Sequence, residues 1–228
     1  AKTSATNPSV AYESFDAAFR EGLDILYLGF SSGLSGTYNA GAVAACELAE
    51  KYPLSNIYTV DTLAASMGQG LLVWYAANMK KDGKSIEEVR DFAQNNKMSL
   101  AHWFTVNDLF FLKRGGRVSA ATAILGTALQ IKPVLHVDNE GHLINVSKAR
   151  GRKASIEALA KKVAELGEGF ENETMFISHG DCAEDARYLA DVLKEKLGVK
   201  HVHINHVGAV IGSHAGPGTM ALFFRGKR

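Results

Sequence analysis

Residues 25–39 read ILYLGFSSGLSGTYN, an apolar run followed by a turn of serines and glycines. An alanine-rich helical pattern comes next and continues to about Tyr52. This order predicts a strand that passes through the turn into the N-terminus of a helix. The first N–H groups of a helix lack intrahelical partners and the helix dipole is positive there, so such a turn can bind an anion. Hydroxyl donors are added by Ser31, Ser32, Ser35 and Thr37.

The turn lacks both common nucleotide-binding signatures. A phosphate-binding loop of the form GxxxxGK[ST] would need a lysine after Gly36, and GxGxxG is absent. A simpler alternative is that Ser35 only caps the helix, because serine is a preferred N-cap residue. That role would leave the other hydroxyl residues of the turn unexplained. The sequence therefore favours an acidic head group other than that of a nucleotide.

Strand and helix patterns alternate along most of the 228 residues, which predicts an α/β protein. We expect two lobes, of approximately residues 1–120 and 121–228, with a parallel sheet in the N-terminal lobe and a mixed α/β C-terminal lobe. The boundary should fall between Arg117 and Ile131. The expected helices cover residues 14–23, 36–52, 64–81, 85–95, 108–113, 155–166 and 183–197. The expected strands cover residues 24–29, 56–60, 102–105, 131–137, 143–146, 175–178, 201–206 and 221–224.

The bulk composition is that of an ordinary globular protein, 46% hydrophobic and 21% charged. A net charge of +1 provides no field that would attract nucleic acid or an anionic membrane. No apolar run is long enough to span a bilayer, and no signal-peptide pattern is present. Cys46 and Cys182 lack CxxC or metal spacing and predict free thiols in a reducing cytoplasm. The histidines at 201, 203 and 206 have no nearby carboxylate, so we expect no metal site.

A second motif, VIGSHAGPGT at residues 210–219, places small and cyclic residues on both sides of His214. Such residues let a backbone approach a ligand closely. A histidine there can donate a hydrogen bond to a carboxylate or act as a general base. The alternative is a tight turn with an exposed histidine. A third segment, TSATNP at residues 3–8, is typical of a turn when taken alone.

The segment LFFLKRGGR at residues 109–117 has the pattern of a helix C-terminus, with cations before a glycine cap. Its two arginines also suggest a basic face together with the cations of residues 148–153. An ordinary solvated surface is the alternative, since runs of charge usually have no specific partner. The sequence alone leaves both interpretations open.

Taken together, these motifs resemble the DegV family of bacterial fatty-acid-binding proteins. The resemblance extends from Thr3 to Gly226, and the order and spacing of the motifs make it highly specific. One motif departs from the family pattern. The family's Thr-Ser-Gln reads Thr3-Ser4-Ala5 here, so no role of that glutamine is expected in this chain. The motifs are the Thr-Ser start, FSSGLSGTYN at 30–39, Val60-Asp61 followed by ASMGQG at 65–70, FFLKRGGRVS at 110–119, IKP at 131–133, KARG at 148–151 and IGSHAGPGT at 211–219.

The family usually has a further strand and helix before the Thr-Ser motif. This chain opens at Ala1, without methionine and in a polar segment. We therefore expect that this N-terminal strand and helix are missing from the chain, and that residues 1–225 form a single DegV-type domain.

The resemblance implies that one long-chain fatty acid of C16–C18, such as palmitate, lies between the two lobes. Its carboxylate would be held by Thr3, Ser35 and His214, without a cofactor or a metal ion. A hydroxyl cluster without a buried arginine would suit an acid that must react later, because a tight ion pair would reduce its nucleophilicity. Supporting positions in the head-group pocket would be Ser4, Ser32, Gly36 and Gly212.

The resemblance further implies that the protein is not itself an enzyme. In related systems the binding protein presents the acyl carboxylate to a separate ATP-dependent fatty-acid kinase, which makes an acyl phosphate. The protein would be cytoplasmic, with no nucleic-acid partner and no stable insertion into a membrane. The residues that dock the kinase would be Arg114, Arg117, Arg150 and Arg152.

A serine-dependent hydrolase of lipids or other esters is the alternative function. Ser35, His214 and Asp61 are the residue types of a catalytic triad, and triads are recognised by geometry and not by chain order. The nucleophile-elbow motif GxSxG is absent in its strict form, because residues 33–36 read GLSG. This departure disfavours hydrolysis.

Overall fold

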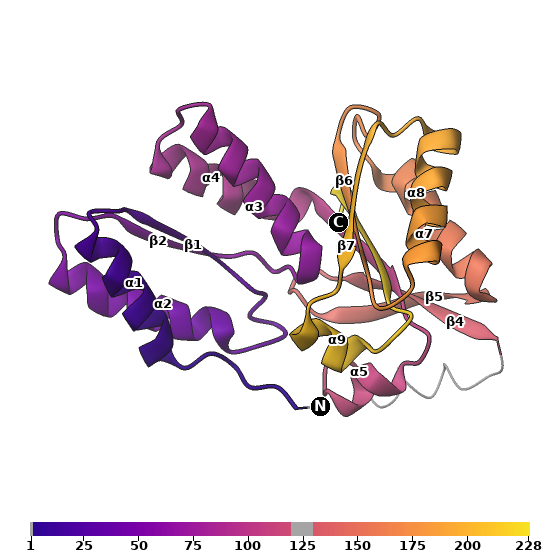
Figure 1. Cartoon of the computed structure of the whole chain (residues 1–228), viewed down its shortest axis with the longest axis horizontal. Coiled ribbons are helices and arrows are strands. Elements are labelled where there is room, and N and C mark those ends of the chain that lie inside the picture. Colours follow the sequence, from indigo (N-terminus) through magenta and orange to yellow (C-terminus); the bar gives the residue numbers. More distant parts are fainter. Residues whose placement is uncertain (1, 120–129) are drawn as a thin grey trace.

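The computed structural model describes residues 2–119 and 130–228, which form two lobes with separate sheets (Figure 1). The smaller lobe contains a parallel sheet of two strands, with α1 and α2 on one face and α3 and α4 on the other. Its elements are α1 (Pro8–Arg20), β1 (Ile25–Gly29), α2 (Thr37–Lys51), β2 (Ile57–Asp61), α3 (Ser66–Lys81) and α4 (Ile86–Asn96).

The larger lobe contains a mixed sheet of six strands in the order β5-β4-β3-β8-β6-β7. Helices α7 and α8 cover one face of this sheet, and α3 packs against the opposite face, so that α3 lies between the two sheets. The elements are a 3-10 helix (Lys97–Ser99), β3 (Leu100–Thr105), α5 (Phe110–Arg114), β4 (Ile131–Val137), β5 (Leu143–Arg150), α7 (Arg152–Leu166), β6 (Thr174–His179), α8 (Ala183–Leu197), β7 (His201–His206), α9 (Ala209–Ala215) and β8 (Met220–Arg225).

Strand β3 lies in the middle of the larger sheet, and all of its residues are buried. Because side chains of a strand alternate between its two faces, neighbouring residues enter different layers. Ala101 and Trp103 join the apolar core beneath α7 and α8. Phe104 belongs to the core on the α3 side, and His102 contacts α3 at Gly68. The face toward α3 therefore carries an imidazole within a mostly apolar layer.

The structure confirms the α/β fold class, with a parallel sheet in the N-terminal part and a mixed sheet in the C-terminal part. The division of the sheets does not coincide with the expected lobe division near residue 120, because β3 pairs antiparallel with both β4 and β8. The sequence places β3 before that boundary, but its partners follow it. Most of the expected boundary between Arg117 and Ile131 falls on residues 120–129, which lie outside the described residues.

Local capping explains where two helices begin. The first helix was expected over residues 14–23 but begins at the proline that follows Asn7, whose side chain accepts a hydrogen bond from the Ser9 N–H at 3.1 Å. An asparagine cap before a proline is a strong helix start. The capping box of α4 is confirmed, since Ser85 Oγ accepts from the Glu88 N–H at 3.2 Å and Glu88 accepts from the Ser85 N–H at 2.9 Å.

Candidate functional site

A cavity of about 500 Å³ lies between the two lobes. Its walls come from the serine turn after β1, the N-terminus of α3, the α3-facing side of the larger sheet, and α9. Small-molecule sites in proteins usually enclose roughly 300–1,000 Å³, so the cavity is large enough for one organic ligand. Most of the lining is apolar, with side chains that include Phe30, Leu34, Met67, Phe104, Leu112, Val137, Leu143, Val207, Ile211, Ala221 and Phe223.

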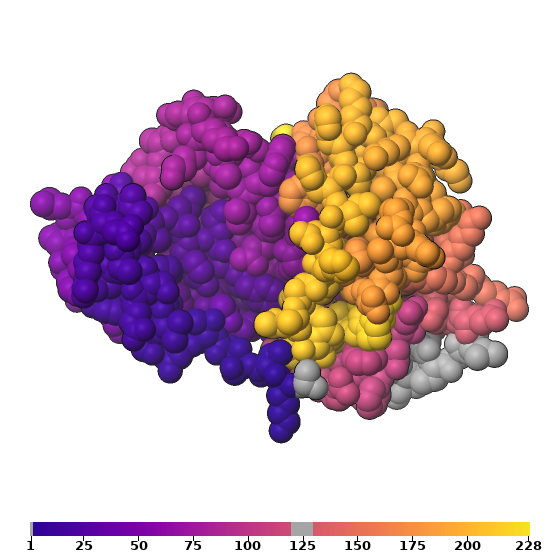
Figure 2. All heavy atoms as spheres, viewed as in Figure 1, coloured from indigo at the N-terminus to yellow at the C-terminus, as the bar shows by residue number. Residues whose placement is uncertain are grey.

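One end of the cavity is polar, and segments far apart in the sequence form it. Thr3 Oγ1 lies 2.7 Å from Nε2 of His214. Figure 2 shows the indigo N-terminal segment against yellow residues near the C-terminus at the lower part of the boundary between the lobes. Thr3 is exposed in the extended segment before α1, whereas His214 is half-buried on the last turn of α9. The structure thus joins two of the three residues that were expected to hold a carboxylate.

The glycine-rich motif around His214 is mainly helical and only ends as a turn. Helix α9 covers its first half, and the chain leaves the helix at Gly216, which has a φ of +79°. A Cβ at Gly216 would overlap the ring of Phe111 on α5. Glycine therefore allows α9 to pack closely against α5, and this packing fixes the position of His214.

Gly115, directly after α5, provides the space that His214 occupies. A Cβ at Gly115 would overlap Nδ1 of the histidine, which is buried and has no hydrogen-bond partner among the described residues. Burial, and then the positive charge of Arg117, lower the pKa of His214. The ring is therefore neutral at neutral pH and donates from one nitrogen only. Nε2 is the nitrogen that faces Thr3.

Ser35 lines the same cavity and also caps α2. Its Oγ accepts a hydrogen bond from the Thr37 N–H at 3.2 Å and lies 2.8 Å from Thr37 Oγ1. The N-cap position itself is Gly36, so the cap comes from the residue before it. The capping role and the binding role considered for Ser35 are therefore compatible, because the half-buried hydroxyl can serve both.

Arg117 lies at the cavity, not on an outer basic face. Its Nε donates a hydrogen bond to the Leu34 carbonyl at 3.1 Å, and its side chain lines the cavity beside His214. The positive φ of Gly116, +71°, reverses the chain after α5 and directs the next residue inward. The expected hydroxyl cluster thus has a half-buried arginine near it, although the hydrogen bonds of Arg117 go to backbone carbonyls.

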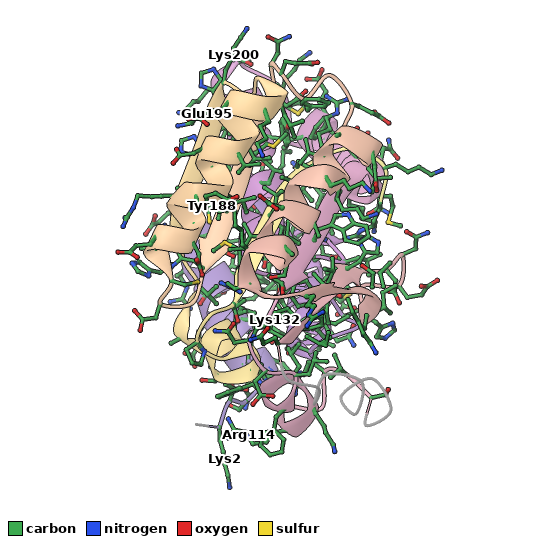
Figure 3. The ribbon with its side chains drawn as sticks, turned by 90° about the vertical axis from the view of Figure 1, so that its right-hand side faces the viewer. Lys2, Arg114, Lys132, Tyr188, Glu195 and Lys200 are labelled. Carbon is green, nitrogen blue, oxygen red and sulfur yellow. The ribbon has the colours of Figure 1, made fainter. Side chains whose placement is uncertain are left out.

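The remaining arginines that were expected to dock a kinase differ in exposure and in their partners. Arg114 is exposed on α5, and Figure 3 shows it extending from the same end of the molecule as Lys2. Arg150 is exposed at the end of β5. Arg152 instead forms an ion pair with Asp185, at 2.7 Å between Nε and Oδ2. Of this group, Arg114 is the exposed cation next to the polar end of the cavity.

The supporting positions separate into two groups. Ser4 lines the cavity, whereas Ser32, Gly36 and Gly212 are not among its lining residues. A Cβ at either glycine would meet open space. Ser32 is exposed, and its N–H donates to Asp61 Oδ1 at 3.2 Å. Ser32 and Gly36 therefore belong to the serine turn and Gly212 to α9, and none of the three forms the cavity wall.

Ser31 joins the serine turn to the larger sheet. It is fully buried, and its Oγ donates a hydrogen bond to the Gly141 carbonyl at 2.9 Å. Gly141 lies in the turn between β4 and β5, where a Cβ would overlap the same hydroxyl. This bond connects the two lobes beside the cavity, so Ser31 acts as a structural residue.

The lining also has polar residues that were not predicted from the sequence, among them Ser66, Ser178 and His102. Ser66 Oγ lies 3.1 Å from Ser178 Oγ and connects α3 to β6. His102 is 1% exposed, in the middle of β3. The available signal for His102 was a polar residue between the apolar Ala101 and Trp103 of β3.

The hydrolase triad is not assembled in this structure. Asp61 Oδ1 accepts from backbone N–H groups of the serine turn and of Leu63. Ser35 and His214 instead form side-chain hydrogen bonds with Thr37 and Thr3, respectively. No set of three or more metal-binding side chains is found within residues 2–119 and 130–228. No helix in that described part of the chain is long and apolar enough to cross a membrane.

Two lobes with an apolar cavity between them and polar groups at one end are typical of a protein that binds an amphipathic small molecule. The chain belongs to the DegV family, because the family model described as "Uncharacterised protein, DegV family" matches residues 1–227.

Individual relatives agree with this assignment. A DegV domain-containing protein from Clostridium perfringens is 50% identical, over 98% of this chain and 77% of its own length. A DegV family protein from Thermus thermophilus, solved for its fatty acid binding, is 33% identical with a TM-score of 0.88, covering 99% of this chain and 79% of that one. A fatty acid binding DegV family protein from Streptococcus agalactiae is 29% identical with a TM-score of 0.86, covering 100% and 79%.

Proposed function

We propose that this protein binds one long-chain fatty acid of C16–C18, such as palmitate, in the cavity between its lobes. The observation that carries the proposal is an apolar cavity that ends at the hydrogen-bonded pair of Thr3 and His214, with Ser35 in the same wall. The fatty acid binding of the Thermus thermophilus and Streptococcus agalactiae relatives supports it.

The hydrocarbon tail supplies most of the affinity. Burying 14 methylenes at roughly 0.8 kcal/mol each gives a gross gain of about 11 kcal/mol. Loss of translational and torsional freedom offsets several kcal/mol of this gain. The polar end acts differently, because a buried carboxylate without hydrogen bonds would be strongly unfavourable. Its side chains therefore fix the position and orientation of the ligand.

The polar end can satisfy a carboxylate, which only accepts hydrogen bonds. Hydroxyl groups of Thr3 and Ser35 and the Nε2–H of His214 are the donors in our proposal, with Ser4 beside them. Arg117 contributes positive charge close to this group. Arg117 carries one positive charge, which balances the single negative charge of the carboxylate. His214 stays neutral and adds no further charge.

The protein also presents the bound carboxylate to a separate ATP-dependent fatty-acid kinase in this proposal, and is not the catalyst. The exposure of Thr3 supports presentation, because the carboxylate would lie near the surface. Lys2 and Arg114 extend from this end of the molecule and would contact the kinase (Figure 3). A cytoplasmic location follows from that role, since the kinase needs ATP.

Lipid analysis of the purified protein tests the binding proposal. Organic extraction followed by mass spectrometry should recover close to one equivalent of a C16–C18 fatty acid. Delipidated protein should take up added palmitate. The alcohol of the same chain length, 1-hexadecanol, should compete poorly with palmitate because it lacks the negative charge. Absence of extracted lipid together with no uptake of palmitate would refute the proposal.

A further inference from the structure

The cavity has a second polar position, away from the Thr3–His214 pair. Ser178 on β6 lies in register with Ala221 on β8, whereas His102 on β3 lies in register with Phe223. Strand β8 follows α9, so moving along it leads away from His214. At about 3.3 Å per residue, these rows lie roughly 7 and 13 Å beyond Thr219, the residue before β8. An acyl chain that runs along β8 from a carboxylate at Thr3 and His214 would pass these polar groups at its middle.

The first turn of α3 connects these polar groups. Ser66 Oγ lies 3.1 Å from Ser178 Oγ, and a Cβ at Gly68 would overlap Nε2 of His102. Ser66 has a φ of +54°, which is uncommon for a residue other than glycine. Such backbone strain is retained mainly where function requires it. The N-cap residue of this helix, Ala65, makes no side-chain hydrogen bond.

His102 has a hydrogen-bond donor without an acceptor. The Arg228 guanidinium, which is only a donor, lies 2.9 Å from His102 Nδ1, so Nδ1 accepts. Burial, then the charges of Arg228 and His136, hold the pKa of His102 well below its ordinary value. The neutral ring therefore carries its hydrogen on Nε2. That atom is buried, and within the described residues it has no partner.

One hydroxyl hydrogen of the Ser66–Ser178 pair also lacks an acceptor within the described chain. Each hydroxyl has one donor and two acceptor sites, so one serine donates to the other and the second keeps its own hydrogen. Apart from this bond, neither hydroxyl has a hydrogen-bond partner in the part of the chain that the structure describes. Ser178 is fully buried and Ser66 half-buried, and both line the cavity. A plain hydrocarbon chain would satisfy neither this hydroxyl nor His102.

We propose that Ser66, Ser178 and His102 form a subsite for an oxygen atom in the middle of the acyl chain. The preferred ligand is then an oxygenated fatty acid, with a hydroxyl or keto oxygen that accepts hydrogen bonds. This inference rests on the proposed fatty-acid binding and names its substrate class more narrowly. An acceptor oxygen on the acyl chain would take the spare hydroxyl hydrogen of the serine pair, and His102 supplies in the same wall a second donor that has no partner among the described residues.

Competition between matched acids tests the inference. Delipidated protein is titrated with stearic acid, 10-hydroxystearic acid, 12-hydroxystearic acid and 2-hydroxystearic acid, and dissociation constants are measured by calorimetry. At least one mid-chain hydroxy acid should bind about tenfold more tightly than stearic acid, since one well-made hydrogen bond contributes on that order. The 2-hydroxy acid should show no such gain, because its hydroxyl lies beside the carboxylate.

Variants separate the subsite from the head-group site. Ser178→Ala should abolish the preference for the mid-chain hydroxy acid while stearic acid binds as before or better. Ser66→Gly, which suits the positive φ, should do the same if the alanine variant does not fold. Ser35→Ala is the control, because it should weaken both acids and leave their ratio unchanged.

The outcomes distinguish the two proposals. Tight binding of stearic acid without any preference for a mid-chain oxygen would overturn the subsite and leave fatty-acid binding intact. A preference that persists in both Ser178→Ala and Ser66→Gly would overturn it as well. Failure of all four acids to bind would refute the proposed function itself.

Discussion

Thr3 and His214 are 211 positions apart, yet Thr3 Oγ1 lies 2.7 Å from His214 Nε2. The pair connects the extended segment before α1 with α9, and it lies at the polar end of the cavity. A carboxylate that enters here meets both groups at once. The two residues should therefore act as one unit.

Thr3→Val should lower palmitate affinity about tenfold, because it removes one hydrogen bond to a charged group at almost constant volume. His214→Gln should have an effect of similar size. The double variant should lose less than the product of the two, since residues in one network are coupled. Isothermal titration calorimetry measures all three, and strictly additive losses would show that the residues act independently.

Gly115→Ala should weaken palmitate binding about tenfold or more, because the new Cβ would displace the His214 ring from its position. Gly212→Ala is the matched control, since a Cβ there meets open space on α9. It should leave affinity unchanged and slightly raise helix stability. Equal affinities of the two variants would contradict the role assigned to Gly115.

Arg117→Ala should weaken binding of palmitate more than binding of an uncharged fatty alcohol, because the guanidinium contributes charge beside the head group. Arg114→Ala, three residues earlier and exposed, should leave palmitate binding unchanged. It should instead slow acyl phosphate formation by the kinase, measured as acyl hydroxamate. Loss of palmitate binding in the Arg114 variant would argue against a docking role.

Ser31→Ala should lower the free energy of unfolding by about 1–3 kcal/mol, because the buried Gly141 carbonyl would lose its hydrogen bond. Ser32→Ala changes the adjacent, exposed hydroxyl and should shift stability by less than about 0.5 kcal/mol. Urea denaturation of the two variants measures the difference. Similar midpoints would indicate that the Ser31 bond does not stabilise the fold.

Stability should fall as the pH decreases below about 6.5, in part because of His102. Burial lowers its pKa in the folded protein, so the unfolded chain binds the proton first. Stability then rises with pH, with a slope of up to about 1.4 kcal/mol per unit for one such group. His102→Gln should reduce this slope between pH 6.5 and 5.5, as measured by urea denaturation. Parallel curves for the two proteins would exclude a titrating His102.

Contiguous motifs were the part of the site that the sequence could predict. Ser35 and its neighbours form one strand–turn–helix unit, so local chemistry was enough to identify the turn. The contribution of Thr3 was implied only by the family resemblance, whereas the glycine-rich motif made His214 a candidate and left a tight turn as the alternative. Their contact depends on the packing of α9 against α5.

The orientation of single side chains was beyond the sequence. Arg117 turns inward because of the positive φ of Gly116, which a run of cations and glycines does not specify. Ser178 and His102 both line the cavity because of the register of β6, β8 and β3. Strand register over long sequence separations is a tertiary property, and periodicity does not determine it.

The position of β8 has a consequence for how the protein folds. β8 lies between β3 and β6, although it follows every other described strand in the sequence. Until β8 has left the ribosome, β5-β4-β3 and β6-β7 are separate ribbons with unpaired inner edges. Such non-local pairing slows folding and exposes strand edges to aggregation. The cavity wall is therefore completed late, and chaperone dependence during synthesis should be greatest before β8 emerges.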